Sequence, residues 1–150
     1  MTETAIDNTA IATESETAAI ESKPSYQYDT IIIGTGPGGE GAAMNLAKFN
    51  RRVAIIERFN AVGGSCTHQG TIPSKALRHS VSRLIEYNAN PLFNPDETPK
   101  RLSFGEILTH ANSVISKQTK LRSSFYSRNN VTLIHGSASF IDRHTLSVIR

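Results

Sequence analysis

Residues 29–57 read DTIIIGTGPGGEGAAMNLAKFNRRVAIIE, and this stretch decides the fold. The β-branched run at 31–33 predicts a short buried parallel strand, and residues 40–49 predict a helix. A second apolar run at 53–56 predicts another strand, which ends on Glu57. The sequence therefore predicts an α/β fold with a Rossmann-like parallel sheet and helices on both faces.

Glycines at a fixed spacing follow the first predicted strand. Gly34 would form a tight turn, Gly36 would let the backbone approach a pyrophosphate, and Gly39 would let helix and strand pack closely. Gly38 stands beside them, where helix N–H groups can hold phosphate. Glu57 would accept hydrogen bonds from ribose hydroxyls. The alternative is a glycine-rich turn without a ligand, but the strand, helix and acid in register favour a dinucleotide site.

Composition limits the classes of function. The 150 residues suffice for one domain with a single core. The net charge is +3, but the first 27 residues hold five acids and one base, which leaves 15 bases and eight acids, or +7, in the remainder. These bases are scattered and lack interleaved aromatic residues, so we expect no nucleic-acid surface. No apolar run is long enough to span a membrane, and the single cysteine, Cys66, favours a reducing, cytoplasmic location.

The first segment of the chain has a different composition. Residues 1–25 are rich in Thr, Ala, Glu and Ser and contain no aromatic residue, so they cannot bury enough apolar surface to offset their ordering entropy. We expect residues 1–27 to form a disordered extension and residues 28–150 to form the nucleotide-binding domain. The extension matches neither a secretory nor a mitochondrial targeting pattern.

Further helices and strands follow the second predicted strand. A helical region is interrupted at Pro73, and a surface loop with three prolines covers residues 88–100. Ser103 and Glu106 have the spacing of a capping box, which predicts the start of the next helix. A buried strand and a short β-meander at the C-terminal end are predicted at 131–134, 138–141 and 146–149.

The motif after the second predicted strand resembles a known family. Residues 63–75 read GGSCTHQGTIPSK and are similar to the signature of the FAD-dependent pyridine nucleotide-disulfide oxidoreductases, which has two cysteines five positions apart and then Pro-Ser-Lys. Cys66 occupies the first cysteine position, Thr71 stands at the second, and residues 73–75 match. One branch of the family, the soluble (Si-specific) pyridine nucleotide transhydrogenases, has this threonine, and residues 66–79 resemble its pattern throughout.

The resemblance implies that the strand–helix–strand unit binds one FAD per subunit, in a domain that continues beyond residue 150. Glu57 would hold the adenosine ribose, and Lys75 would lie beside the isoalloxazine, where a cation stabilises negative charge on reduced flavin. The backbone near Gly136 and Ala138 would lie close to the adenine. The loop after the second strand would line the dinucleotide with Arg58, Phe59, Asn60, Ala61, Val62, Gly63, Gly64, Ser65 and Cys66.

The implied reaction is hydride transfer between NADPH and NAD⁺ through enzyme-bound FAD, with both nicotinamide nucleotides as small-molecule substrates. The nicotinamide-binding and dimerisation domains of the family would follow residue 150. We therefore expect the chain alone to be inactive and the full-length protein to be a homo-oligomer.

Two alternatives stay open from the residues. A dihydrolipoamide dehydrogenase-like, FAD-dependent disulfide reductase needs two cysteines within bonding distance, and the chain has only Cys66. The other alternative is a truncated nucleotide-binding module without activity. We expect no catalytic residue within the chain, because Cys66 has no partner thiol, and no metal site, because the five histidines lack metal-ligand spacing.

Overall fold

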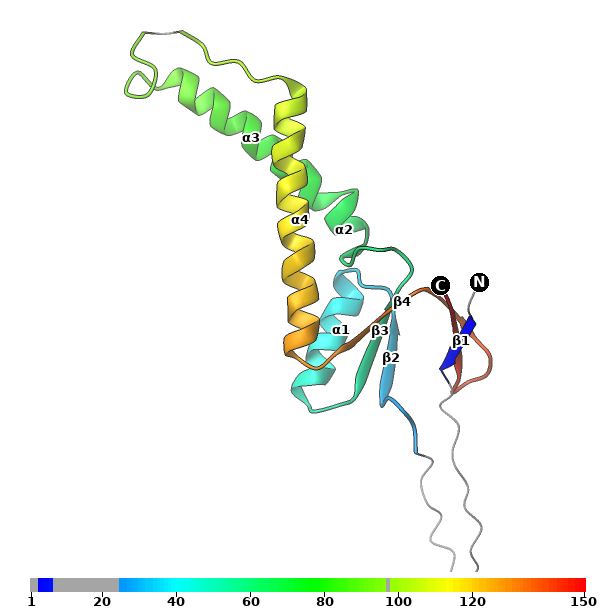
Figure 1. The fold of residues 1–150 in the computed structure, drawn as a ribbon. Coiled ribbons are helices and arrows are strands. Elements are labelled where there is room, and N and C mark those ends of the chain that lie inside the picture. Colours follow the sequence, from blue (N-terminus) through cyan, green and yellow to red (C-terminus); the bar gives the residue numbers. More distant parts are fainter. Residues whose placement is uncertain (1–2, 7–24, 97) are drawn as a thin grey trace, which may run out of the picture. The chain divides into compact units, whose positions relative to one another are not determined.

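The computed structural model describes residues 3–6, 25–96 and 98–150. The chain forms two compact units. The sheet unit comprises Met1–Val62 and Phe125–Arg150, and the helical unit comprises Gly63–Ser124. The parallel strands predicted from the sequence lie in the sheet unit (Figure 1).

A three-stranded parallel sheet is the centre of the sheet unit. Its strands pair in the order β2–β3–β4, with β2 at Thr30–Ile33, β3 at Val53–Glu57 and β4 at Thr132–His135. The helix α1 (Pro37–Lys48) joins β2 to β3, so the predicted strand–helix–strand unit is confirmed. β3 is the middle strand, and all five of its residues are buried, because a parallel strand between two neighbours is covered on both faces.

The burial of β2 differs from the sequence prediction. Its residues are half-buried, and Ile33 is 51% exposed. β2 stands at one edge of the sheet and, within the described residues, pairs with β3 alone. The β-branched run predicts the strand correctly but not its burial, since burial depends on the place of the strand in the sheet.

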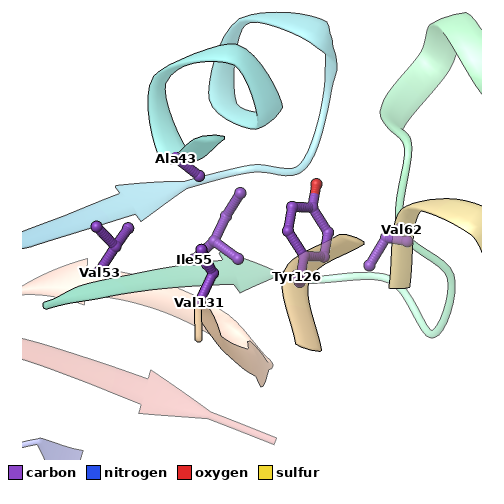
Figure 2. Packing of buried hydrophobic residues seen from close by; sticks show 6 residues of the cluster. All are labelled: Ala43, Val53, Ile55, Val62, Tyr126 and Val131. Carbon is purple, nitrogen blue, oxygen red and sulfur yellow. The ribbon is translucent and has the colours of Figure 1, made fainter. Parts of the chain in front are cut away.

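One face of the parallel sheet carries the main core. Six buried side chains gather there between the sheet, α1 and the end of α4 (Phe104–Arg128), and Figure 2 shows them as Ala43, Val53, Ile55, Val62, Tyr126 and Val131. Apolar burial of this kind is the main source of stability in such a unit. The core fixes β3 under α1 and thereby fixes the turn that joins β2 to α1.

The opposite face of the sheet is covered by strands. β5 (Ser137–Phe140) and β6 (Leu146–Ile149) pair antiparallel and form the predicted meander. Because successive residues of a strand point to opposite faces, Ile56 lies on this side, where it packs with Leu146 and Val148. The sequence predicts helices on both faces, and here the apolar side of β6 takes the place of one helix layer.

The antiparallel sheet also includes a segment from the start of the chain. β1 (Glu3–Ile6) pairs antiparallel along β6, in the order β1–β6–β5. The sequence predicts disorder over residues 1–27, whereas this segment is a strand, because the second edge of β6 offers backbone partners that composition cannot reveal. Residues 1–2 and 7–24 lie outside the described residues, and disorder stays a prediction there.

The helical unit contains α2 (Gly64–His68), α3 (Thr71–Ala89) and most of α4. The break between α2 and α3 comes at Gly70 rather than at the predicted Pro73. Pro73 lies in the first turn of α3, where its missing N–H is not needed. The predicted capping box is confirmed, since the Glu106 N–H donates to the Ser103 hydroxyl at 3.3 Å and the Ser103 N–H donates to the Glu106 carboxylate at 2.7 Å.

Candidate nucleotide-binding site

The glycine turn between β2 and α1 is tightly built. The Gly34 N–H donates to the Ile56 carbonyl at 2.7 Å, which extends the pairing of β2 with β3, and Gly34 takes a φ of +95°. A β-carbon on Gly39 would collide with the Gly34 carbonyl oxygen. The tight turn and the close approach of helix to strand that the sequence predicts are therefore both present.

The N-terminus of α1 faces open space. Gly36 is the N-cap and has no side chain to bond the N–H groups of the first turn, and Pro37 follows it. A β-carbon on Gly36 or on Gly38 would meet nothing within 4 Å. N–H groups at a helix N-terminus without intrahelical partners attract anions such as phosphate. This end of α1 therefore suits the diphosphate of a dinucleotide.

Glu57 is the last residue of β3 and is only 4% exposed. The Thr35 N–H donates to Glu57 Oε2 at 3.1 Å, and the Thr35 hydroxyl donates to the same oxygen. The Phe59 N–H donates to Oε1 at 3.0 Å. Burial raises the pKa of Glu57, but these hydrogen bonds, with one from the Arg58 N–H, outweigh burial and hold that pKa below its ordinary value. The carboxylate is therefore ionised and held in one orientation.

Residues far apart in the sequence meet around Glu57. A cavity of about 320 Å³ lies where the parallel strands end, and its lining includes Gly34, Glu57 and Gly136. The Gly136 N–H donates to the Glu57 carbonyl at 2.9 Å, which joins the turn after β4 to the end of β3. Ligands bind at the carboxyl ends of the strands in open α/β sheets. The rest of the lining consists of Ile33, Ile56, Arg58, Ser137 and Ala138.

The structure thus brings five predicted site residues to one cavity, namely Gly34, Glu57, Arg58, Gly136 and Ala138. The sequence separates the first from the last by about a hundred positions, and the pairing of β3 with both β2 and β4 brings them together. The groups that this cavity offers to a ligand are a fixed carboxylate, backbone groups and apolar side chains.

The loop after β3 continues along the surface of the sheet unit. Arg58 and Asn60 line a second cavity of about 280 Å³ beside His135. The Arg58 guanidinium lies 4.7 Å from the centre of the Phe59 ring, and His135 Nδ1 lies 3.0 Å from the Phe59 carbonyl oxygen. The second of these contacts ties the loop to the end of β4.

Several predicted site residues line neither cavity. Val62 is buried in the main core, and Ala61 is half-buried. Five further predicted site residues belong to the helical unit, namely Gly63, Gly64, Ser65, Cys66 and Lys75. Cys66 carries a free thiol in α2, and Lys75 is exposed on α3. Their contacts with a cofactor stay predictions.

Thr35 is a site residue that sequence reasoning missed. It occupies the variable position between the first two glycines of the motif, so the motif carries no information about it. The sequence signal that could have pointed to Thr35 is a hydroxyl residue at that position together with an acid at the end of the following strand. The hydrogen bond between the two side chains becomes visible only in the folded structure. Ser137, which lines the cavity, was also missed.

Within residues 3–6, 25–96 and 98–150, no group of three or more His, Cys, Asp or Glu side chains could hold a metal ion. No helix in these ranges is both long and apolar enough to cross a membrane.

A family model described as pyridine nucleotide-disulphide oxidoreductase matches residues 28–148. The chain belongs to this family. The match covers the turn, Glu57 and the cavity, and it confirms the resemblance and the parallel-sheet fold predicted from the sequence.

Individual relatives resemble the chain more closely. A protein named soluble pyridine nucleotide transhydrogenase from Colwellia psychrerythraea (strain 34H) is 69% identical over 124 residues, which are 83% of this chain and 27% of that relative. A protein of the same name from Escherichia coli (strain K12) is 58% identical with the same coverage. The chain thus spans 27% of the length of these curated relatives.

A solved structure shares the fold. The Cu(II) complex of the HOCl-induced flavoprotein disulfide reductase RclA from Escherichia coli matches with a TM-score of 0.66 and 30% identity. The match covers 82% of this chain and 24% of that protein.

Proposed function

We propose that this chain is the FAD-binding portion of an NAD(P)⁺ transhydrogenase, a flavoprotein oxidoreductase that transfers hydride from NADPH to NAD⁺. The observation that carries the proposal is the buried, ionised Glu57 in a cavity beside the glycine turn. A carboxylate there accepts hydrogen bonds from free ribose hydroxyls and repels a 2′-phosphate, which favours the adenosine of FAD over that of NADP. The names of the relatives support the choice of reaction.

The residues of the sheet unit fit the adenosine diphosphate half of FAD. The N-terminus of α1, at Gly36 to Gly39, would hold the diphosphate, and Glu57 would hold the ribose. The backbone at Gly136 and Ala138 would lie beside the adenine. In the helical unit, Lys75 would place a positive charge beside the isoalloxazine. Bound FAD supplies the group that accepts and donates hydride, while the residues of this chain bind and orient it.

The choice between hydride exchange and disulfide reduction depends on Thr71. Disulfide reduction requires a thiolate that attacks a disulfide and a second thiol that resolves the product. Cys66 is the only cysteine of the chain, and Thr71, at the start of α3, offers a hydroxyl instead. A hydroxyl is no redox group, and it is a weak nucleophile without a neighbouring base. Nicotinamide is therefore the expected acceptor, and the disulfide-reductase alternative is disfavoured.

The remaining parts of the proposal concern the whole protein. NADPH and NAD⁺ would bind outside these 150 residues, since the ten glycines include no second motif of this kind. A homo-oligomer is supported by exposed apolar side chains on the helices, such as Val81 and Ile85 on α3. A cytoplasmic location is supported by the word "soluble" in the names of the relatives.

Release of the cofactor tests the proposal. The purified protein is heated, and the released chromophore is separated by chromatography beside FAD and FMN standards. We expect FAD, because Glu57 and the N-terminus of α1 would bind the adenosine diphosphate half that FMN lacks. Release of FMN, or a protein that takes up neither flavin on titration, contradicts the proposal.

A further inference from the structure

We propose that Thr35 is a positioning residue for the ribose site, whose hydroxyl fixes the Glu57 carboxylate in the orientation that accepts the ribose. The inference rests on the proposed function and deepens it. Thr35 is fully buried, at 0% exposure, and lies in the glycine turn itself. It is therefore the side chain of the motif that links the phosphate end of the site to its ribose end.

Both oxygens of Glu57 accept hydrogen bonds, and Thr35 holds one of them. A carboxylate oxygen has two lone pairs. Oε2 receives two bonds from Thr35, one from its N–H at 3.1 Å and one from its hydroxyl. Oε1 receives the Phe59 N–H at 3.0 Å, and the Arg58 N–H bonds the same carboxylate. Since Glu57 lines the cavity, a ribose hydroxyl is the further donor that this carboxylate would accept.

The Thr35 hydroxyl also lowers the pKa of Glu57. Burial favours the neutral acid, and the bond from the Thr35 hydroxyl is the largest of the effects that oppose burial. Other titratable groups stand nearby: Arg58 follows in the chain, His135 lies opposite Glu57 in the β3–β4 ladder, and Glu40 lies in the first turn of α1. Without the hydroxyl, burial would be opposed only by the backbone hydrogen bonds, and the pKa of Glu57 would rise.

A purely structural role for Thr35 makes a different prediction. If the methyl and hydroxyl of Thr35 only filled space, Thr35→Val would preserve the shape, and any loss of affinity would not depend on Glu57. If Thr35 acts through Glu57, its effect must vanish when the carboxylate is removed. A double-mutant cycle separates the two roles.

The cycle compares FAD affinity in four proteins: wild type, Thr35→Val, Glu57→Ala and the double variant. We expect Thr35→Val to weaken FAD about tenfold in the wild-type background and less than about twofold in the Glu57→Ala background. Thr35→Ser keeps the hydroxyl and should restore most of the affinity. An equal loss in both backgrounds, or no rescue by serine, overturns the proposal.

A second measurement needs no flavin. The pKa of Glu57 is followed by the ¹³C shift of its carboxyl carbon in flavin-free protein, with His135→Gln as a background that removes the neighbouring histidine titration. We expect a higher Glu57 pKa in Thr35→Val than in wild type or in Thr35→Ser. An unchanged pKa in Thr35→Val overturns the role of Thr35. A protein whose Glu57 pKa responds as expected but which takes up no FAD contradicts the proposed function instead, so the two failures are distinguishable.

Discussion

At the scale of single residues, the ribose assignment depends on Glu57. Its carboxylate is buried and ionised, and Glu57 lines the cavity, so Glu57→Ala removes a charge-assisted acceptor while the glycines of the turn remain. We expect FAD affinity to fall by about 1–3 kcal/mol, measured by flavin fluorescence titration.

Glu86→Ala is the matched control for this variant. Glu86 is an exposed glutamate of α3 that pairs with Arg83 at 2.8 Å in the helical unit. Its replacement should leave FAD affinity unchanged. Equal affinities of wild type and Glu57→Ala would contradict the assignment of the ribose to Glu57.

The glycine turn offers a second test at this scale. In Gly39→Ala the new methyl group meets the Gly34 carbonyl oxygen, so α1 must move away from β2. We expect the free energy of unfolding to fall by about 1–3 kcal/mol, measured by urea denaturation. Gly41→Ala is the control, because a β-carbon there meets nothing within 4 Å, and alanine should raise stability by about 0.5–1 kcal/mol through its helix propensity. A Gly39→Ala variant as stable as Gly41→Ala would contradict the close approach of helix and strand.

At the scale of helices and strands, the capping box of α4 can be tested by itself. Ser103→Ala removes the hydroxyl that accepts the Glu106 N–H and should lower the free energy of unfolding by about 0.5–2 kcal/mol. Ser113→Ala changes an exposed serine within the same helix and should stay within about 0.5 kcal/mol of wild type. Equal effects of the two substitutions would mean that the cap contributes nothing to α4.

The sequence predicts those parts of the fold that depend on local pattern. The apolar run of β3, the turn at Gly34 and the capping box at Ser103 all lie where expected, because each signal is contained in a few neighbouring residues. The burial of β2 and the strand β1 were not predicted, because both depend on which neighbour a strand finds in its sheet.

The same distinction applies to the site. The acid Glu57 and the glycines were predicted from spacing, and Gly136 from family resemblance. Thr35 was missed, since its contact with Glu57 spans 22 positions and lies at a variable place in the motif. Contacts of this kind follow from the pairing of β2 with β3 and not from any pattern along the chain.

At the scale of the whole molecule, the length of the chain relative to its relatives determines what it can do alone. The chain spans 27% of the length of the curated relatives, and hydride exchange needs a nicotinamide site in addition to the flavin site. We expect the 150-residue chain, with excess FAD, to catalyse no transfer from NADPH to NAD⁺, measured by the absorbance of a thionicotinamide analogue of NAD⁺. Robust exchange by the isolated chain would mean that the glycine turn holds a nicotinamide nucleotide rather than FAD.

The most direct test of the proposed function compares two reactions of the FAD-loaded full-length protein, as wild type and as Cys66→Ser. One assay measures hydride exchange between NADPH and the thionicotinamide analogue, and the other measures NADPH oxidation by lipoamide or glutathione disulfide. We predict exchange at similar rates in both proteins and no reduction of either disulfide, because Thr71 leaves Cys66 without a resolving thiol. Disulfide reduction that is lost in Cys66→Ser would contradict the proposal.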